Sequence, residues 1–178
     1  TFSLPREVLP TLGGAEDAEI LLPLPLGPDD ATVRRGEDYN LLATLKPGEK
    51  VLAYADVYGG TFRLMKRVFE TFGVVPIFTE DTSPAAFAKL IDKQTRLVWL
   101  ESPTNPLLRV LDIAAIAKVA HDAGALVCVD NTFATPVLQL PIALGADYVL
   151  HSTTKYIGGH SDVVGGAIIM RDKSLQER

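Results

Sequence analysis

The segment from Tyr148 to His160 holds an apolar run that breaks into hydroxyl side chains, one lysine and two glycines. Such a change is typical of the point where a buried strand ends. The primary amine of Lys155 could form an imine with an aldehyde there, and the hydroxyls of Ser152 and Thr154 could donate hydrogen bonds to a phosphate. The segment therefore suggests chemistry on a cofactor that carries both an aldehyde and a phosphate.

Further polar side chains follow other predicted strands. Asp130 and Glu101 each come directly after an apolar run, and Tyr58 stands just beyond another. Because ligands of open α/β sheets bind in the crevice outside the carboxyl ends of the strands, we expect these residues to meet Lys155 at one rim.

The elements that must position these residues alternate along the chain. From Lys50 onward, short β-branched runs alternate with segments of helical period, which predicts a three-layer α/β fold with a mostly parallel sheet and helices on both faces. The predicted strands are Lys50 to Ala55, Val74 to Phe78, Arg96 to Leu100, Ala125 to Val129, Tyr148 to His151 and Ala167 to Met170.

Helices are predicted in most of the gaps. Gly73 is placed to end the first helix in a left-handed turn, while Ser83 and Asp112 are placed to cap the starts of two others. Apolar residues spaced by three and four along the first helix predict a stripe that packs in the core. These residues are Phe62, Met65, Phe69 and Phe72.

The N-terminal residues 1–40 differ from the rest of the chain. Prolines interrupt them repeatedly, so that no clean period survives, and we expect an irregular segment. Within it, the apolar run from Ile20 to Leu26 suits an edge strand better than a central one. We expect residues 41–178 to form a single domain.

Composition excludes several classes of function. The chain has 178 residues, 47% of them hydrophobic, and a net charge of −5 without a basic cluster, which argues against nucleic acid as a partner. No apolar run is long enough to span a bilayer, and no secretory signal pattern is present, so we expect a cytoplasmic protein with no membrane partner. Cys128 lies in an apolar run and is expected to be a buried, inert thiol. We expect no metal site.

Together the polar residues suggest pyridoxal phosphate catalysis, in which the cofactor withdraws electrons and the protein positions it. Lys155 would hold the aldehyde and then act as a general base at the substrate Cα, although a solvated loop lysine is the simpler interpretation of that residue alone. Asp130 would pair with the pyridine nitrogen, and the alternative is a helix cap or turn.

The remaining candidates also have two interpretations each. Ser152 and Thr154 could bind the phosphate or satisfy local backbone groups. Tyr58 could stack on the pyridine ring or merely pack at the rim. Asn105 could donate to the ring's 3-hydroxyl oxygen, or belong to an ordinary Pro-Thr-Asn-Pro turn.

At this point the chain carries a family resemblance. From about Leu41 to the C-terminus it resembles, in motif order and spacing, the trans-sulfuration enzymes of Cys/Met metabolism, which include cystathionine γ-lyase, cystathionine γ-synthase, methionine γ-lyase and O-acetylhomoserine sulfhydrylase. The motifs are Asp56-Val57-Tyr58-Gly59-Gly60-Thr61, Glu101-Ser102-Pro103-Thr104-Asn105-Pro106, Val129-Asp130-Asn131-Thr132-Phe133-Ala134-Thr135-Pro136 and His151-Ser152-Thr153-Thr154-Lys155-Tyr156-Ile157-Gly158-Gly159-His160-Ser161-Asp162.

The resemblance implies the large domain of the pyridoxal-phosphate-dependent transferase fold type I. It also implies the cofactor-binding roles described above for Lys155, Asp130, Tyr58, Asn105, Ser152 and Thr154. Tyr58 would in addition help to transfer protons. Glu101 matches an acid of the same pocket, and His160 matches a residue for which we expect a loop-fixing hydrogen bond.

A finer assignment also follows from the resemblance. Gly60 stands where methionine γ-lyases typically carry a cysteine, and Phe133 stands where enterobacterial cystathionine β-lyase has tryptophan. We therefore expect γ-elimination or γ-replacement on a sulfur amino acid or activated homoserine, by a lyase or transferase that forms a homodimer or homotetramer.

Other features depart from the family. The resemblance implies a C-terminal small domain with an arginine that binds the substrate carboxylate. Residues 1–178 do not contain this domain. The Ser-Gly-Met turn and the Tyr-x-Arg pair that bind the phosphate are also absent from the sequence. The alternative is therefore a non-catalytic truncated α/β module that retains part of the cofactor site and acts as a structural or oligomerisation piece.

Overall fold

A computed structural model of the chain describes residues 20–21, 45–171 and 175. In this part of the chain a seven-stranded sheet has the strand order β1-β7-β6-β5-β4-β2-β3. Its strands are β1 Ile20–Leu21, β2 Lys50–Tyr54, β3 Val75–Thr79, β4 Thr95–Glu101, β5 Leu126–Asp130, β6 Tyr148–Ser152 and β7 Gly166–Met170.

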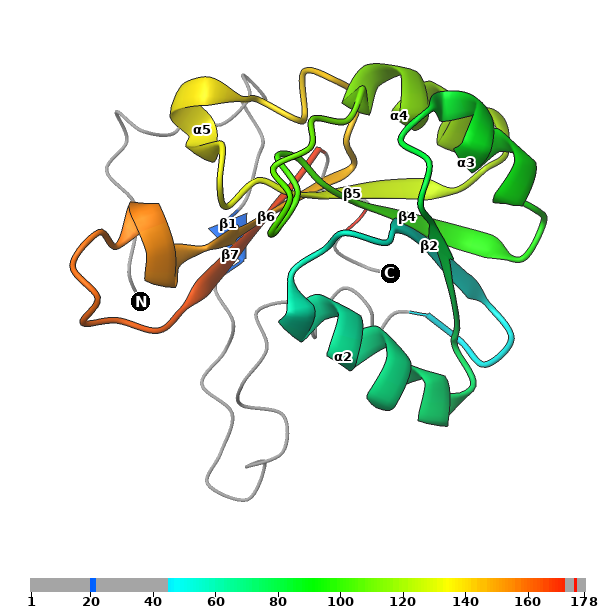
Figure 1. The fold of residues 1–178 in the computed structure, drawn as a ribbon, viewed down its shortest axis with the longest axis horizontal. Coiled ribbons are helices and arrows are strands. Elements are labelled where there is room, and N and C mark those ends of the chain that lie inside the picture. Colours follow the sequence, from blue (N-terminus) through cyan, green and yellow to red (C-terminus); the bar gives the residue numbers. More distant parts are fainter. Residues whose placement is uncertain (1–19, 22–44, 172–174, 176–178) are drawn as a thin grey trace.

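Helices cover both faces of this sheet. Figure 1 shows α2 on one face and α3, α4 and α5 on the other, so the predicted three-layer α/β fold is confirmed. The helices are α2 Gly59–Arg67, α3 Pro84–Leu90, α4 Ile113–Asp122 and α5 Thr135–Leu138. A 3-10 turn, η2 Phe69–Phe72, follows α2, and a π-helical turn, η3 Thr153–Ile157, follows β6.

Each predicted strand is present, with ends that differ by at most one residue. Neighbouring strands among β2, β3, β4, β5 and β6 pair in parallel, whereas β7 pairs antiparallel with both β6 and β1. The sheet is therefore mostly parallel, as predicted. Ile20 and Leu21 form an edge strand, which confirms the edge prediction for these two residues. The rest of the predicted irregular segment, residues 1–19 and 22–40, lies outside the described residues.

The α2 face of the sheet packs around Trp99, Met65 and Phe69, which are all buried. Two members of the predicted core stripe do not belong to it, because Phe62 is 41% exposed and Phe72 is 66% exposed. For Phe72 the reason is that α2 ends at Arg67 and the chain continues as a 3-10 turn, whose period of three residues breaks the stripe. Phe62 lies within α2, at the margin of the cluster, where its ring centroid lies 5.0 Å from that of Phe78. Gly73 closes the turn with φ 83°, as predicted.

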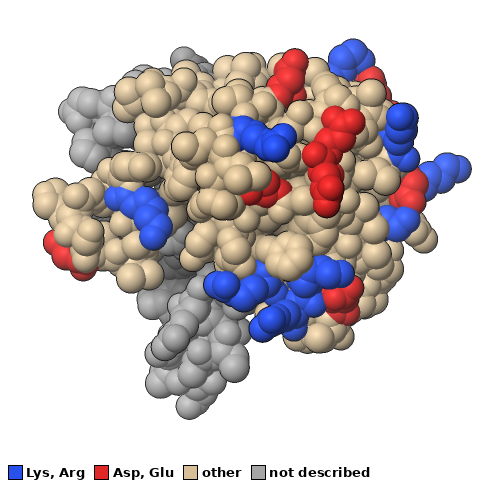
Figure 2. Space-filling model, in the orientation of Figure 1, with Lys and Arg blue, Asp and Glu red and all other residues tan. Residues whose placement is uncertain are grey.

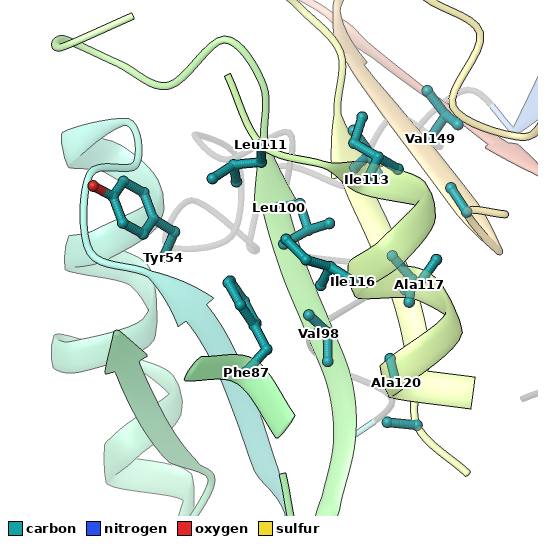
Figure 3. Close-up of a cluster of buried hydrophobic side chains, with 14 of the residues drawn as sticks. Tyr54, Phe87, Val98, Leu100, Leu111, Ile113, Ile116, Ala117, Ala120 and Val149 are labelled. Atoms are coloured by element: carbon teal, nitrogen blue, oxygen red, sulfur yellow. The ribbon is translucent and has the colours of Figure 1, made fainter. Parts of the chain in front are cut away.

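The opposite face packs against α3 and α4 through a second apolar cluster, shown in Figure 3 with Phe87, Leu100 and Ile116 at its centre. The predicted caps begin both helices. The Ser83 hydroxyl accepts the Ala86 N–H at 3.3 Å, and the Asp112 carboxylate accepts the Ala115 N–H at 3.0 Å. Local sequence signals therefore place these two helices correctly.

At the amino ends of the strands, the buried Asp147 carboxylate joins three elements. It accepts the Val127 N–H at 2.8 Å and lies 2.8 Å from His121 Nε2 and 2.7 Å from Arg171 Nη2. These contacts tie α4, β5 and the end of β7 together. They lie at the edge of the sheet opposite the candidate site, so Asp147 has a structural role.

The surface carries charges of both signs. Figure 2 shows Lys and Arg side chains interspersed with Asp and Glu over much of the visible face. On α2, for example, Lys66 pairs with Glu70 at 2.9 Å. Within the described ranges, no helix is long and apolar enough to cross a membrane.

Candidate active site

Three polar side chains from neighbouring strands share one face at the carboxyl edge of the sheet. Glu101 is paired with Asp130 in the register of β4 and β5, and Asp130 is paired with Leu150, two residues before Ser152. Since side chains alternate along a strand, Glu101, Asp130 and Ser152 lie on the same face as the buried residues two positions before them. Those residues, Trp99, Cys128 and Leu150, belong to the cluster under α2. The predicted convergence is therefore present for these three residues.

Tyr58 lies at the start of α2, on this same face of the sheet. Its backbone N–H donates a hydrogen bond to Glu101 Oε2 at 2.7 Å, and its side chain is 49% exposed. A Cβ atom at Gly60 would lie 2.3 Å from Tyr58 Cε1, so the ring occupies the space that a side chain at position 60 would need. The exposed ring can thus stack on a ligand while the Tyr58 backbone is held by Glu101.

Asn105 lies partly buried in the loop that follows β4. The preceding residue anchors this loop, because the Thr104 hydroxyl donates to Asp56 Oδ2 and accepts the Arg109 N–H at 2.9 Å. The Leu107 N–H donates to the same Asp56 oxygen at 3.1 Å. The structure therefore holds the backbone on both sides of Asn105. Sequence reasoning did not identify Asp56 or Thr104, because their partners are distant in the chain.

Thr132 connects the two strand ends that carry the main candidate residues. Its N–H donates to Asp130 Oδ1 at 2.9 Å, and its hydroxyl accepts the Ser152 N–H at 2.8 Å. This arrangement orients the Asp130 carboxylate, which is only 8% exposed, and fixes the backbone before Lys155. The only sequence signal for this connecting role of Thr132 was a threonine placed two residues after an aspartate.

A second bridge joins the loops after β4 and β5. Gln139 Nε2 donates to the Ser102 carbonyl and to Asn131 Oδ1, both at 2.8 Å. Asn131 in turn donates to the Gln139 carbonyl at 3.0 Å. Asn131 and Ser102 are buried, so these bonds are shielded from water and make the carboxyl edge rigid.

Lys155 lies exposed in the turn η3, and its backbone departs from helical geometry with φ −92° and ψ −121°. The neighbouring Thr154 hydroxyl lies 3.2 Å from the Gly165 carbonyl oxygen, to which it donates, and accepts the Gly165 N–H at 2.9 Å. This is the local backbone interaction that was the alternative to phosphate binding. A phosphate ligand would have to compete with the Gly165 carbonyl for the hydroxyl proton.

The two histidines of this segment have different surroundings. His160 Nδ1 donates to the Gly158 carbonyl at 2.7 Å, which confirms the predicted loop-fixing bond. His151 is 2% exposed, and burial lowers its pKa from 6.5 to about 4. By the alternation of β6, His151 faces the α4 side of the sheet, away from Asp130 and Ser152. It is therefore a neutral buried residue outside the candidate site.

The functional groups at this edge fit pyridoxal phosphate in their chemistry. Lys155 supplies a primary amine for an aldehyde, Asp130 a buried carboxylate for a protonated pyridine nitrogen, and Asn105 an amide for the ring oxygen. The space left by Gly60 admits an aromatic ring that can stack on the pyridine. No group of His, Cys, Asp and Glu suited to a metal ion occurs in the described part of the chain.

Comparison with known proteins agrees with this interpretation. Residues 36–178 match the model of the family described as Cys/Met metabolism PLP-dependent enzyme. The chain is 53% identical to a probable cystathionine gamma-synthase of Herpetosiphon aurantiacus, over 80% of this chain and 45% of the relative. It is 48% identical to the cystathionine gamma-lyase of Bacillus subtilis, over 73% of this chain and 34% of the relative.

A solved structure of a relative shows the same fold. The crystal structure of cystathionine gamma-lyase from Lactobacillus plantarum complexed with L-serine superposes with a TM-score of 0.75 at 44% identity, covering 77% of this chain and 36% of that one. The chain thus spans less than half the length of the relatives named above. The family model and the fold both match, and the chain belongs to the family of pyridoxal-phosphate-dependent enzymes of Cys/Met metabolism.

Proposed function

We propose that this chain is the cofactor-binding part of an enzyme that carries out γ-elimination or γ-replacement on a sulfur amino acid or an activated homoserine. The observation that supports this most strongly is the joint placement of Asp130, Ser152 and Tyr58 on the α2 face of the carboxyl edge. Relatives named as a cystathionine gamma-synthase and a cystathionine gamma-lyase support the choice of reaction class.

Each candidate side chain has a distinct task in this proposal. Pyridoxal phosphate, when bound, withdraws electrons from the substrate Cα. Asp130 would keep a proton on the pyridine nitrogen through a charge-assisted hydrogen bond. Tyr58 would stack on the ring, Asn105 would donate to the ring oxygen, and Ser152 and Thr154 would bind the phosphate.

Lys155 would carry most of the proton transfer. Its amine would hold the cofactor's aldehyde until a substrate amine replaces it, and would then move protons at the substrate Cα and Cβ so that the group on Cγ can leave. A lyase and a synthase need the same residues for these steps. They differ in whether a thiol then adds at Cγ.

The surroundings of the site suggest further properties. Tyr58 and Lys155 are both exposed in the described part of the chain, so a neighbouring subunit could complete the site, and we propose a homodimer or homotetramer. The proposed partner is a small amino-acid substrate, and the proposed location is the cytoplasm.

Product analysis with the chain supplied with cofactor tests the reaction class. Cystathionine should release cysteine and 2-oxobutanoate if the chain acts as a γ-lyase, and O-acetylhomoserine with cysteine should yield cystathionine and acetate if it acts as a γ-synthase. Methionine, as a third substrate, should react more slowly than the favoured one of these two.

The controls separate chemistry at this site from background reactions. Lys155→Ala should abolish the reaction, whereas Lys118→Ala, which removes an exposed lysine paired with Asp122 on α4, should leave it unchanged. Release of homocysteine and pyruvate from cystathionine would instead show cleavage at Cβ. That result would contradict the proposal.

A further inference from the structure

We propose that Asp56 and Glu101 are reciprocal positioning residues at the ends of two neighbouring strands. Each carboxylate binds the segment that follows the other residue's strand. Asp56 follows β2 and binds the loop after β4, while Glu101 ends β4 and binds the backbone at Tyr58, beyond β2. We call this arrangement the carboxylate latch. Its purpose, which rests on the proposed function, is to fix Tyr58 and Asn105 relative to each other.

The first arm of the latch is Glu101. Its side chain is buried, with the residue 4% exposed, and its Oε2 accepts the Tyr58 N–H at 2.7 Å. Tyr58 is the residue before the first turn of α2, where backbone N–H groups lack helical partners. A carboxylate acceptor makes this bond short and strong, so Glu101 determines where the tyrosine leaves the backbone. Glu101 is therefore assigned a positioning role.

The second arm is Asp56, which runs in the opposite direction. One oxygen, Oδ2, accepts both the Thr104 hydroxyl proton and the Leu107 N–H, the latter at 3.1 Å. These two donors flank Asn105. Thr104 also closes the loop on itself, because its backbone N–H donates to the Arg109 carbonyl at 2.9 Å. Asp56 therefore holds a closed turn that carries the asparagine.

The two arms restrain the same pair of loops. The strands β2 and β4 are adjacent and parallel, so both loops leave the same edge of the sheet. A movement of either loop away from the other must stretch the Glu101 arm, the Asp56 arm or both. The ring of Tyr58 and the amide of Asn105, the candidates for the face and the oxygen of one pyridine ring, are thus fixed with respect to each other.

Amide hydrogen exchange on the chain without cofactor tests the latch directly. In Asp56→Ala, exchange at the Leu107 and Arg109 amides should become about tenfold faster relative to core amides of β4, because the loop loses its acceptor. The Tyr58 amide should stay protected by Glu101. Conversely, Glu101→Leu should expose the Tyr58 amide, while Glu101→Gln, which keeps an acceptor oxygen, should retain much of the protection.

Asp81→Ala is the matched control. Asp81 also follows a strand and accepts a backbone N–H at 2.8 Å, but from Ser83, two residues further along its own turn. This variant should leave the exchange of Leu107 and Tyr58 unchanged. Unchanged exchange at Leu107 in Asp56→Ala would overturn the latch, whether or not the chain binds cofactor.

A second measurement reads the effect on the cofactor site. The pH midpoint of the visible absorbance of bound pyridoxal phosphate should shift in Asn105→Ala, and Asp56→Ala should shift it in the same direction. If Asp56 acts through Asn105, the double variant should shift no further than Asn105→Ala alone. Asp56→Asn, which can still accept, should restore much of the midpoint.

The outcomes separate the latch from the proposed function. Additive shifts, or no shift in Asp56→Ala, would overturn the positioning role. Complete failure of every variant and of the parent chain to bind cofactor would refute the proposed function, and the exchange experiment would still decide whether the latch exists.

Discussion

The Thr132 hydroxyl accepts the backbone N–H of Ser152 at 2.8 Å, and this bond ties the end of β6 to the loop after β5. The same residue donates its own N–H to Asp130 Oδ1. The carboxylate proposed for the pyridine nitrogen and the strand end that leads to Lys155 therefore share one support. Asp130 can be changed chemically without loss of this support if the new side chain still accepts a hydrogen bond.

Asp130→Asn should keep bound cofactor but lose most of its turnover. The amide oxygen can still accept the Thr132 N–H, whereas a neutral side chain no longer stabilises a proton on the pyridine nitrogen, so kcat should fall about 100-fold or more. The measurement is kcat together with cofactor content. Asp112→Asn, at the helix cap of α4, is the control and should keep the parent rate. Near-normal turnover in Asp130→Asn would refute the assigned role.

A side chain at position 60 should impair cofactor binding, while one at position 59 should not. The Cβ of Gly60→Ala would lie 2.3 Å from Tyr58 Cε1, so the ring must move, whereas the nearest atom to a Cβ at Gly59 is Arg63 Nη1 at 3.7 Å. Loss of stacking should raise the Kd for pyridoxal phosphate about tenfold in Gly60→Ala.

Gly59→Ala is the matched control for this pair. Both glycines begin α2, so alanine has a similar effect on helix propensity at either position. Titration of both variants with cofactor, followed by absorbance, compares them. Equal affinities would show that the position of the Tyr58 ring has no bearing on binding.

The strands were predictable because their apolar, β-branched runs are bounded by turn residues, and the strand-end position of Asp130 followed from them. The exposure of Phe72 was not predictable, because the change from α2 to a 3-10 turn depends on packing. Nor could the sequence reveal the acceptor role of Asp56. Its partner Thr104 is 48 residues away, and such a contact exists only once β2 and β4 lie side by side.

Acid should destabilise the fold through His151. Burial lowers the pKa of this residue to about 4 in the folded chain, whereas histidine in an unfolded chain has a pKa near 6.5. Between these values the unfolded state binds more protons, so the stability present above about pH 6.5 is lost as the pH falls towards 4. From about pH 7 to about pH 5 the contribution lost is about 2 kcal/mol.

Urea unfolding of the parent chain and of His151→Leu at both pH values measures this contribution. The parent should lose about 2 kcal/mol more than His151→Leu on acidification, because leucine cannot take up the proton. His160→Ala, which removes an exposed histidine, should follow the parent. An identical pH dependence in the parent and His151→Leu would show that His151 is not the group responsible.

The central claim is that Lys155 is the residue that holds the cofactor, and it can be tested on the protein directly. The chain is incubated with pyridoxal phosphate, reduced with borohydride to make any imine permanent, digested and analysed by mass spectrometry. We predict that the cofactor's mass is found on the peptide that contains Lys155, that Lys155→Ala carries none at that site, and that Lys118→Ala is labelled like the parent. A chain that remains unlabelled, or that carries the label chiefly on another lysine, would contradict the account.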